Sequence, residues 1–201
     1  MRMLSTESAT VTPLAKSGPR PLSASQSELW YRSQLASGSP VYNELIEIRK
    51  TGSLDVDVLR RAFDEVVARH EAWRTTFDTV DGTPHQFVHE SMEVELTLAD
   101  LSDLPAQEGN ARAVEIAAGD MMRPYDLAEG PLIRPRLIRM AEDDHRLYIA
   151  LHHLIWDGAT LKRVVFPALI ALYRSYAAGL SSSLPDPEVQ YSDYTAWGLA
   201  A

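Results

Sequence analysis

The chain has 201 residues, 45% of them hydrophobic and 23% charged, which is an ordinary balance for a soluble globular protein of one domain or two small ones. Its formal net charge of −9 argues against nucleic acid or an anionic membrane as the main partner, and no run approaches the ~20 apolar residues of a membrane helix. The absence of cysteine excludes disulfides, thiolate catalysis and thiolate metal sites, and it is compatible with a reducing cytoplasm.

The N-terminal segment is rich in Ser, Thr and Pro and lacks the apolar core of a secretory signal, so we expect residues 1–20 to be a mobile leader. The next segment predicts the start of a helix, because Ser25 and Glu28 have the spacing of a capping box. The side chains expected to face inward from this helix are Leu29, Trp30 and Leu35.

The clearest helix of the sequence covers residues 55–73, because apolar residues recur there at i, i+3 and i+4, and Asp55 is its predicted N-cap. The predicted stripe consists of Val58, Leu59, Ala62, Phe63, Val66 and Val67. Two more helices are predicted over residues 107–122 and 159–180, and Pro167 should kink or weaken the second.

Alternating apolar residues predict strands over residues 41–50 and 92–101. Two hairpins are expected, one around Asp81-Gly82 and one around residues 142–144. Helices and hairpins are interspersed without an internal repeat, so the sequence predicts an α+β fold with a mainly antiparallel sheet covered by helices.

Two adjacent histidines end the second hairpin, in the segment LYIALHHLIWDG of residues 147–158. Side chains alternate faces along a strand, so His152 and His153 should point to opposite sides and do different work. Asp157 and Gly158 then turn the chain into the next helix, and Asp157 taken alone is most simply a helix N-cap. Because the two imidazoles point apart, they cannot chelate one ion, and we expect no metal site.

Several segments, in the same order along the chain as in the family, carry a family resemblance. HHLIWDG resembles the HHxxxDG motif of the superfamily that includes chloramphenicol acetyltransferase and the condensation domains of nonribosomal peptide synthetases. SASQSELW resembles the SxAQxxLW motif of condensation domains with Ser25 in place of alanine, and RHEAWRTTF resembles RHExLRTxF with Trp73 in place of leucine. The segments RPYDLAEGPLIRPRLIR and VQYSDYTAW also look like parts of this family, so the resemblance runs from about residue 21 to 198.

The resemblance implies a chloramphenicol acetyltransferase-like fold and a reaction that joins two thioester substrates. Those substrates would arrive on the phosphopantetheine arms of donor and acceptor carrier proteins, with no cofactor bound directly to the domain. The second histidine of the motif, His153, would be catalytic, either as a general base or as the group that holds the attacking amine; both alternatives stay open.

The resemblance also assigns supporting roles at the site. His152 would be structural, Asp157 would pair with an arginine that is either Arg69 or Arg74, and Gly158 would leave backbone room near the reacting carbonyl. The indole of Trp156 stands where the family has a small or polar residue, so it would either narrow the substrate tunnel or, as we expect, point into the core.

A whole condensation domain is about twice as long and has two similar lobes. Residues 21–180 should therefore form an N-terminal lobe, and residues 181–201 a linker and the start of a crossover to a C-terminal lobe. We expect this lobe alone to be inactive and to self-associate as a homodimer or by exchange of its C-terminal segment. The alternatives are a non-catalytic module that docks a carrier protein, and a coenzyme A-dependent acyltransferase, which fits HHxxxDG but not the flanking motifs.

Overall fold

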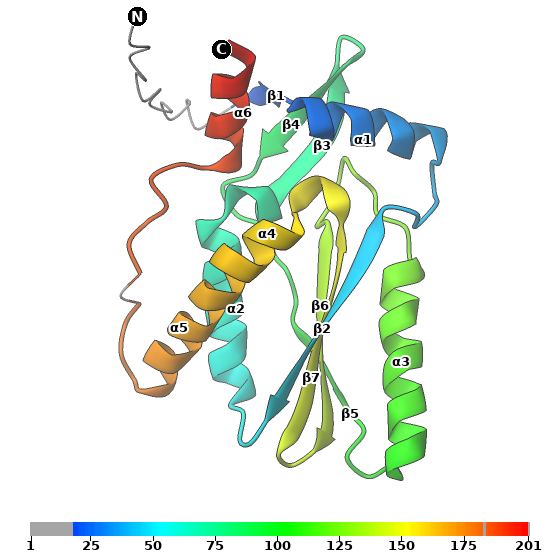
Figure 1. Cartoon of the computed structure of the whole chain (residues 1–201), viewed down its shortest axis with the longest axis vertical. Coiled ribbons are helices and arrows are strands. Elements are labelled where there is room, and N and C mark those ends of the chain that lie inside the picture. Colours follow the sequence, from blue (N-terminus) through cyan, green and yellow to red (C-terminus); the bar gives the residue numbers. More distant parts are fainter. Residues whose placement is uncertain (1–17, 183, 201) are drawn as a thin grey trace, which may run out of the picture.

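The computed structural model describes residues 18–182 and 184–200, and it contains two β-sheets with helices packed against them (Figure 1). Within these ranges, no helix is both long and apolar enough to cross a membrane. The elements in chain order are β1 (Pro19–Pro21), α1 (Ala24–Leu35), β2 (Asn43–Thr51), α2 (Val56–Arg69), the 3₁₀ turn η1 (Glu71–Arg74), β3 (Thr75–Val80), β4 (Thr83–Val88), β5 (Thr97–Asp100), α3 (Ala106–Met122), β6 (Ile133–Ala141), β7 (Asp144–His152), the 3₁₀ turn η2 (His153–Ile155), α4 (Gly158–Thr160), the π-helical turn η3 (Leu161–Val165), α5 (Phe166–Ala177) and α6 (Tyr191–Ala200).

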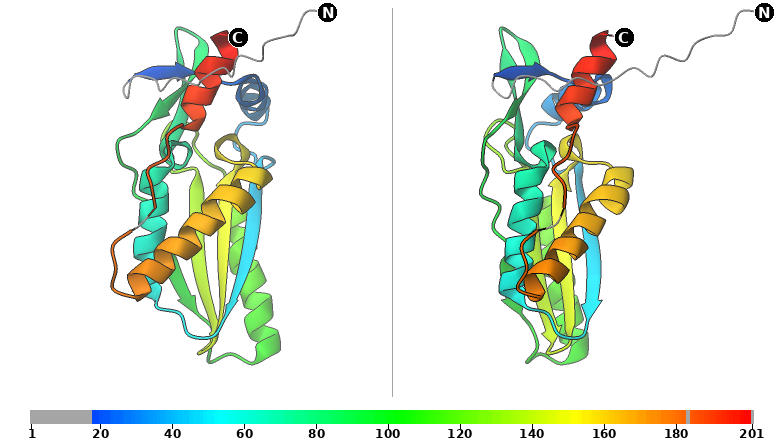
Figure 2. Two further views of the ribbon diagram at one scale, coloured as in Figure 1. Left: turned by 60° about the vertical axis from the view of Figure 1, so that its left-hand side comes forward. Right: turned by 90° about the vertical axis from the view of Figure 1, so that its left-hand side faces the viewer.

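The larger sheet has the strand order β2-β7-β6-β5, and its pairs are antiparallel except for β5 with β6. The smaller sheet has the order β1-β4-β3 and is antiparallel. Helices α2 and α5 cover one face of the larger sheet, and α3 covers the other (Figure 2). The predicted α+β architecture is confirmed, although the strands divide between two sheets.

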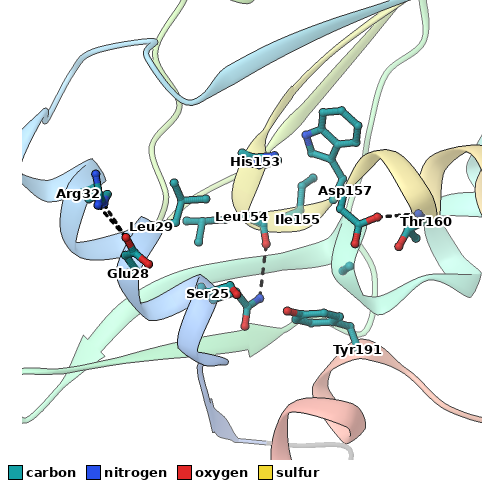
Figure 3. A pocket seen from close by; sticks show the side chains of 13 residues that line it. Ser25, Glu28, Leu29, Arg32, His153, Leu154, Ile155, Asp157, Thr160 and Tyr191 are labelled. Carbon is teal, nitrogen blue, oxygen red and sulfur yellow. Dashed lines mark hydrogen bonds and ion pairs between the residues drawn. The ribbon is translucent and has the colours of Figure 1, made fainter. Parts of the chain in front are cut away.

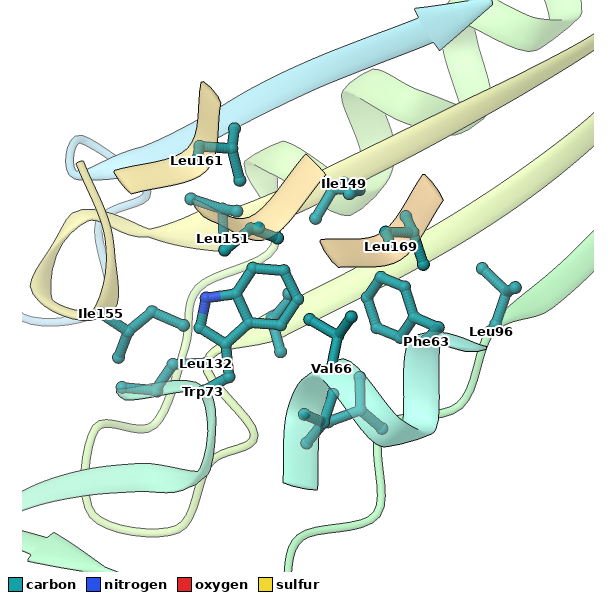
Figure 4. Close-up of a cluster of buried hydrophobic side chains, with 14 of the residues drawn as sticks. Phe63, Val66, Trp73, Leu96, Leu132, Ile149, Leu151, Ile155, Leu161 and Leu169 are labelled. Carbon is teal, nitrogen blue, oxygen red and sulfur yellow. The ribbon is translucent and has the colours of Figure 1, made fainter. Parts of the chain in front are cut away.

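Strand β7 separates two hydrophobic clusters, one on each face of the larger sheet. Its residues Leu147, Ile149 and Leu151 enter the main cluster, whereas Tyr148 enters a smaller cluster against α3. This alternation follows from the strand geometry that the sequence predicts. The main cluster also holds the predicted stripe of α2 and includes Phe63, Val66, Trp73, Leu161 and Leu169 (Figure 4).

The cap of α1 differs from the prediction. Ser23, not Ser25, is the N-cap: its hydroxyl accepts from the backbone N–H of Gln26 at 3.1 Å, and the Gln26 side chain accepts from the backbone N–H of Ser23 at 3.1 Å. The capping box therefore begins two residues earlier. Trp30 is buried and Leu29 packs on the main cluster, but Leu35 is 91% exposed, because five residues turn a helix by about 140° away from the face of Trp30.

The start of α2 and the first hairpin match their predictions. The Asp55 carboxylate accepts from the backbone N–H groups of Asp57 and Val58, each at 3.0 Å. Asp81 and Gly82 both have positive φ, at 51° and 77°, as a two-residue hairpin turn requires. The helix predicted over residues 55–73 is shorter, because the backbone at His70 is extended and a 3₁₀ turn follows.

Two other elements are shorter or less regular than expected. The strand predicted over residues 92–101 is confined to β5. The helix predicted over residues 159–180 is divided by the π-helical turn η3, which precedes Pro167. Proline has no N–H and its ring crowds the carbonyl four residues earlier, so the predicted weakening at Pro167 is confirmed.

The two ends of the described chain lie together, and the sequence predicts that the first of them belongs to a leader. Strand β1 pairs with β4, so Pro19 and Arg20 belong to the fold and not to a leader of residues 1–20; residues 1–17 of that prediction lie outside the described residues. Helix α6 packs beside β1. From β1, the Arg20 side chain bonds Glu71 of η1 at 2.8 Å and also Ser192 of α6. The segment after residue 190 therefore packs against the first strand of the described chain.

Candidate active site

The sequence motif HHLIWDG forms the turn that connects β7 to α5, and this turn borders a cavity of about 500 Å³. The cavity lies between that turn and α1, and Tyr191 of α6 closes one side (Figure 3). Its volume is in the range of small-molecule sites, about 300–1,000 Å³. The lining combines polar side chains with apolar ones: Ser25, Gln26, Glu28, Leu29, Arg32, Ala72, His153, Leu154, Ile155, Trp156, Asp157, Thr160 and Tyr191.

His153 presents its imidazole to this cavity. Its side chain is 44% exposed, and its Nδ1 atom lies 3.2 Å from Oε1 of Glu44 on β2. The ring stands edge-on to the indole of Trp156, with centroids 5.7 Å apart. Its backbone N–H donates to the carbonyl of Tyr42 at 2.9 Å, which fixes the main chain where β7 ends. An accessible imidazole held in this way can accept a proton or hold an amine.

His152 has the opposite environment. It is buried, and its ring packs edge-on between Tyr42 and Tyr125. Its Nδ1 accepts from the backbone N–H of Leu154 at 3.2 Å, so Nε2 carries the proton. Burial, together with the neighbouring His153, lowers the pKa of His152 to about 4. The two histidines therefore have different environments, as strand alternation predicts: His152 is buried and its pKa is low, whereas His153 is accessible.

Asp157 does not form the arginine pair that the resemblance implies. It is exposed, and its carboxylate accepts from the backbone N–H of Thr160 at 2.7 Å as the N-cap of α4. Arg69, at the end of α2, instead bonds the linker carbonyls and two acidic side chains, and Arg74 bonds the backbone carbonyl of His89. The arginine pairing is wrong for the described chain, because Arg69 and Arg74 bond other partners, and the helix-cap interpretation is correct.

The remaining expectations concern the space around Gly158 and the position of the Trp156 indole. A Cβ at Gly158 would meet no heavy atom within 4 Å, and its φ is outside the left-handed region, so glycine leaves open space there without being required by the backbone. Trp156 is half-buried: it packs on the main cluster and also lines the cavity. The expected contact of Trp156 with the core is therefore confirmed, and the narrowing of a substrate tunnel stays a prediction.

Sequence reasoning did not single out most of the lining residues, and it also missed the contacts of Glu44 and Tyr191. Each reaches the site through tertiary structure: Glu44 through the pairing of β2 with β7, and Tyr191 through the return of α6, where its hydroxyl lies 3.0 Å from that of Ser23. No spacing in the sequence signals either contact. Among the described residues, no group of three His, Asp or Glu side chains is arranged to hold a metal ion.

Comparison with known proteins gives a consistent family. The sequence model of the condensation domain matches residues 16–200. A linear gramicidin synthase of Brevibacillus parabrevis is 36% identical over 190 residues, which are 94% of this chain and 2% of that protein. Phosphinothricin tripeptide synthetase PhsC of Streptomyces viridochromogenes is 36% identical over 180 residues, which are 90% of this chain and 16% of that protein.

Solved structures show the same fold. The starter condensation domain of rhizomide synthetase RzmA has a TM-score of 0.82 at 23% identity, over 92% of this chain and 44% of that chain. A chain of the complex of the X-domain and OxyB from teicoplanin biosynthesis has a TM-score of 0.77 at 26% identity, over 96% of this chain and 40% of that chain. This chain thus spans less than half of these structures and a small part of the curated relatives.

We predict that Asp157→Ala lowers the free energy of unfolding by about 1 kcal/mol, the usual effect of losing an N-cap. Asp157→Asn should cost less, because an asparagine oxygen also caps helices. Denaturant unfolding of both variants measures this. A loss of ~3–5 kcal/mol in both would instead indicate a buried ion pair.

The buried His152 should make the fold sensitive to acid. The unfolded chain binds a proton near the ordinary histidine pKa of 6.5, whereas the folded chain resists it to about pH 4, so the free energy of unfolding should fall as the pH drops between these values. The slope from this one group is about 1.4 kcal/mol per pH unit. His70 and His145, whose pKa values burial also lowers, add to the slope in the same direction.

Urea unfolding of the wild-type chain and of His152→Gln at several pH values isolates the contribution of His152. The variant should be less stable at neutral pH but should lose less stability on acidification. Equal slopes for the two proteins would contradict the assignment.

Proposed function

The chain belongs to the condensation domain family, and from this premise we propose that it forms the N-terminal lobe of a domain that makes a peptide bond between carrier-bound substrates. The acceptor amine attacks the carbonyl carbon of the donor thioester. The C–N bond forms, the C–S bond breaks, and the departing thiolate takes up the proton that the amine gives up. His153 is the catalytic residue of this lobe.

One observation supports this proposal most strongly: the accessible imidazole of His153 lines the cavity, while the adjacent His152 is buried and neutral. The lobe thus offers one histidine for chemistry. A neutral imidazole can take the proton of the attacking amine, which is worth about 10²–10⁴ in rate, or it can hold the amine in line with the carbonyl.

The substrates and partners follow from the same proposal. Both substrates arrive as thioesters on the phosphopantetheine arms of a donor and an acceptor carrier protein, and the lobe itself binds no cofactor directly. The related solved structures are more than twice as long as the region they share with this chain. We therefore propose that a C-terminal lobe supplies the remaining wall of the site.

A second candidate is a lobe that docks another protein without catalysis. The relative that favours it is the chain from the complex of the X-domain and OxyB, which is 26% identical to this chain. The free coenzyme A acyltransferase is weaker, because the curated relatives that match most of this chain are peptide synthetases such as the linear gramicidin synthase.

We predict that His153→Ala, in the complete two-lobe domain, lowers the condensation rate by about 100-fold or more, because a proton acceptor at the cavity is lost. The assay supplies aminoacyl groups loaded on donor and acceptor carrier proteins and measures peptide product by mass spectrometry. The half-buried His85 on β4 lies far along the chain from the motif, so His85→Ala is the matched control and should retain turnover.

The outcome separates the two candidates. If His153→Ala has wild-type turnover with an unchanged melting curve, the catalytic role of His153 is lost. If the wild-type domain binds loaded carrier protein but forms no product, the docking function is favoured.

We also propose that this chain self-associates in isolation. Large side chains on α1 and α6 are more than half exposed, namely Tyr31, Leu35, Tyr194 and Leu199. Monomeric proteins rarely leave broad apolar patches uncovered. Light scattering coupled to size exclusion should give a mass above that of the 22.4 kDa monomer, and a monomeric mass at tens of micromolar would contradict this.

A further inference from the structure

The carboxylate that contacts the imidazole of His153 belongs to Glu44 of strand β2. Glu44 is the second residue of β2, and the ladder sets it opposite Leu151 of β7. His153 is two residues beyond Leu151, which is the diagonal position that a long side chain on a neighbouring strand can reach. Accordingly, Oε1 of Glu44 lies 3.2 Å from Nδ1 of His153.

Hydrogen bonds hold the two residues that precede Glu44. Before Glu44, the carbonyl of Tyr42 accepts from the backbone N–H of His153 at 2.9 Å. Between them, the buried Asn43 donates its side-chain amide to the carbonyls of Met121 and Arg123, at 2.7 and 3.0 Å. Strand β2 is thereby tied both to the histidine turn and to the end of α3, so the backbone that carries Glu44 is held beside His153.

The chemistry of the carboxylate and the imidazole decides which group can donate a hydrogen bond to the other. A carboxylate is acceptor-only, and a neutral imidazole carries one proton on one of its two nitrogens. Which nitrogen is protonated depends on the partner of the other, so a carboxylate at Nδ1 favours the form with the proton on Nδ1. That form leaves the lone pair of Nε2 free. The indole of Trp156 also packs against the ring, with the two planes at 71°.

We infer that Glu44 is a positioning residue for His153: its carboxylate accepts the Nδ1 proton, and Nε2 is thereby kept as the proton acceptor toward the cavity. This inference rests on the proposed function for its catalytic meaning. The ring tautomer, however, is a property of this chain alone and can be measured without any turnover.

The first test measures the tautomer of His153 in this chain at mildly alkaline pH, by long-range ¹H–¹⁵N correlation on protein labelled with ¹⁵N-histidine. Loss of one set of ring signals in His153→Ala assigns the resonances. In the wild type, Nδ1 should be protonated and Nε2 should not. Glu44→Ala should move the proton to Nε2 in a large fraction of molecules, whereas Glu44→Gln should preserve the wild-type form, because its amide oxygen is also an acceptor.

Glu47→Ala is the matched control, because Glu47 lies on the same strand with the opposite facing and is exposed. It should leave the tautomer of His153 unchanged. If Glu44→Ala does not fold, Glu44→Thr replaces it with a strand-compatible side chain too short to reach the ring. A wild-type tautomer in Glu44→Ala or in Glu44→Thr would overturn the inference.

The second test measures turnover in the complete two-lobe domain. Glu44→Ala should lower kcat by up to about 100-fold with KM little changed, as expected when a reactive group is misplaced, and Glu44→Gln should recover part of the loss. If the wild-type domain forms no peptide, the proposed function fails while the tautomer still decides the role of Glu44. If the tautomer moves as expected but kcat does not change, Glu44 sets the tautomer of His153 without affecting turnover. Its role as a positioning residue for catalysis is then rejected.

Discussion

The antiparallel pairing of β2 with β7 is the constraint on which the rest of the site depends. Strand β7 is buried on both faces, so its register cannot slip by one residue without moving its apolar side chains to the wrong cluster. That register ends with Asn43 opposite His152. The last paired histidine is therefore enclosed, and the next residue, His153, is released into a turn at the rim of the cavity. The two imidazoles have different environments because the β2–β7 pairing ends at His152.

The enclosed histidine contributes order to the turn that follows it. His152 accepts from Leu154 inside an aromatic cage, and the next two apolar residues of the motif, Leu154 and Ile155, pack into the main cluster. These contacts anchor the turn on both sides of His153. Leu154 and Ile155 also line the cavity, and the polar side chains that the motif turn contributes to it are those of His153, Trp156 and Asp157. Figure 3 shows His153 and Asp157 at this turn. A site assembled in this way presents one accessible imidazole on an anchored turn, which favours a defined geometry for a reacting amine.

Local patterns predicted those features that depend on neighbours in sequence. The alternation of β7 separated His152 from His153, the carboxylate of Asp55 predicted a helix cap, and Asp81-Gly82 predicted a hairpin turn. The family resemblance singled out His153 but assigned Asp157 a partner that it does not have. Contacts that depend on strand register or on the return of a distant helix had no signal, and Glu44 is the clearest example. Its role is visible only once Leu151 is known to lie opposite it.

The bridge from Arg20 to α6 has a consequence for how the chain reaches this structure. Arg20 and Ser192 are 172 residues apart in sequence, so their contact closes almost the whole described chain into a loop. The entropy cost of such a closure rises with loop length, and contacts this remote generally form after local ones. The hairpins and α2 can form from near neighbours, whereas the wall of the cavity that carries Tyr191 must wait for the two ends to meet. We therefore expect the hairpins and α2 to form before α6 completes the wall of the cavity.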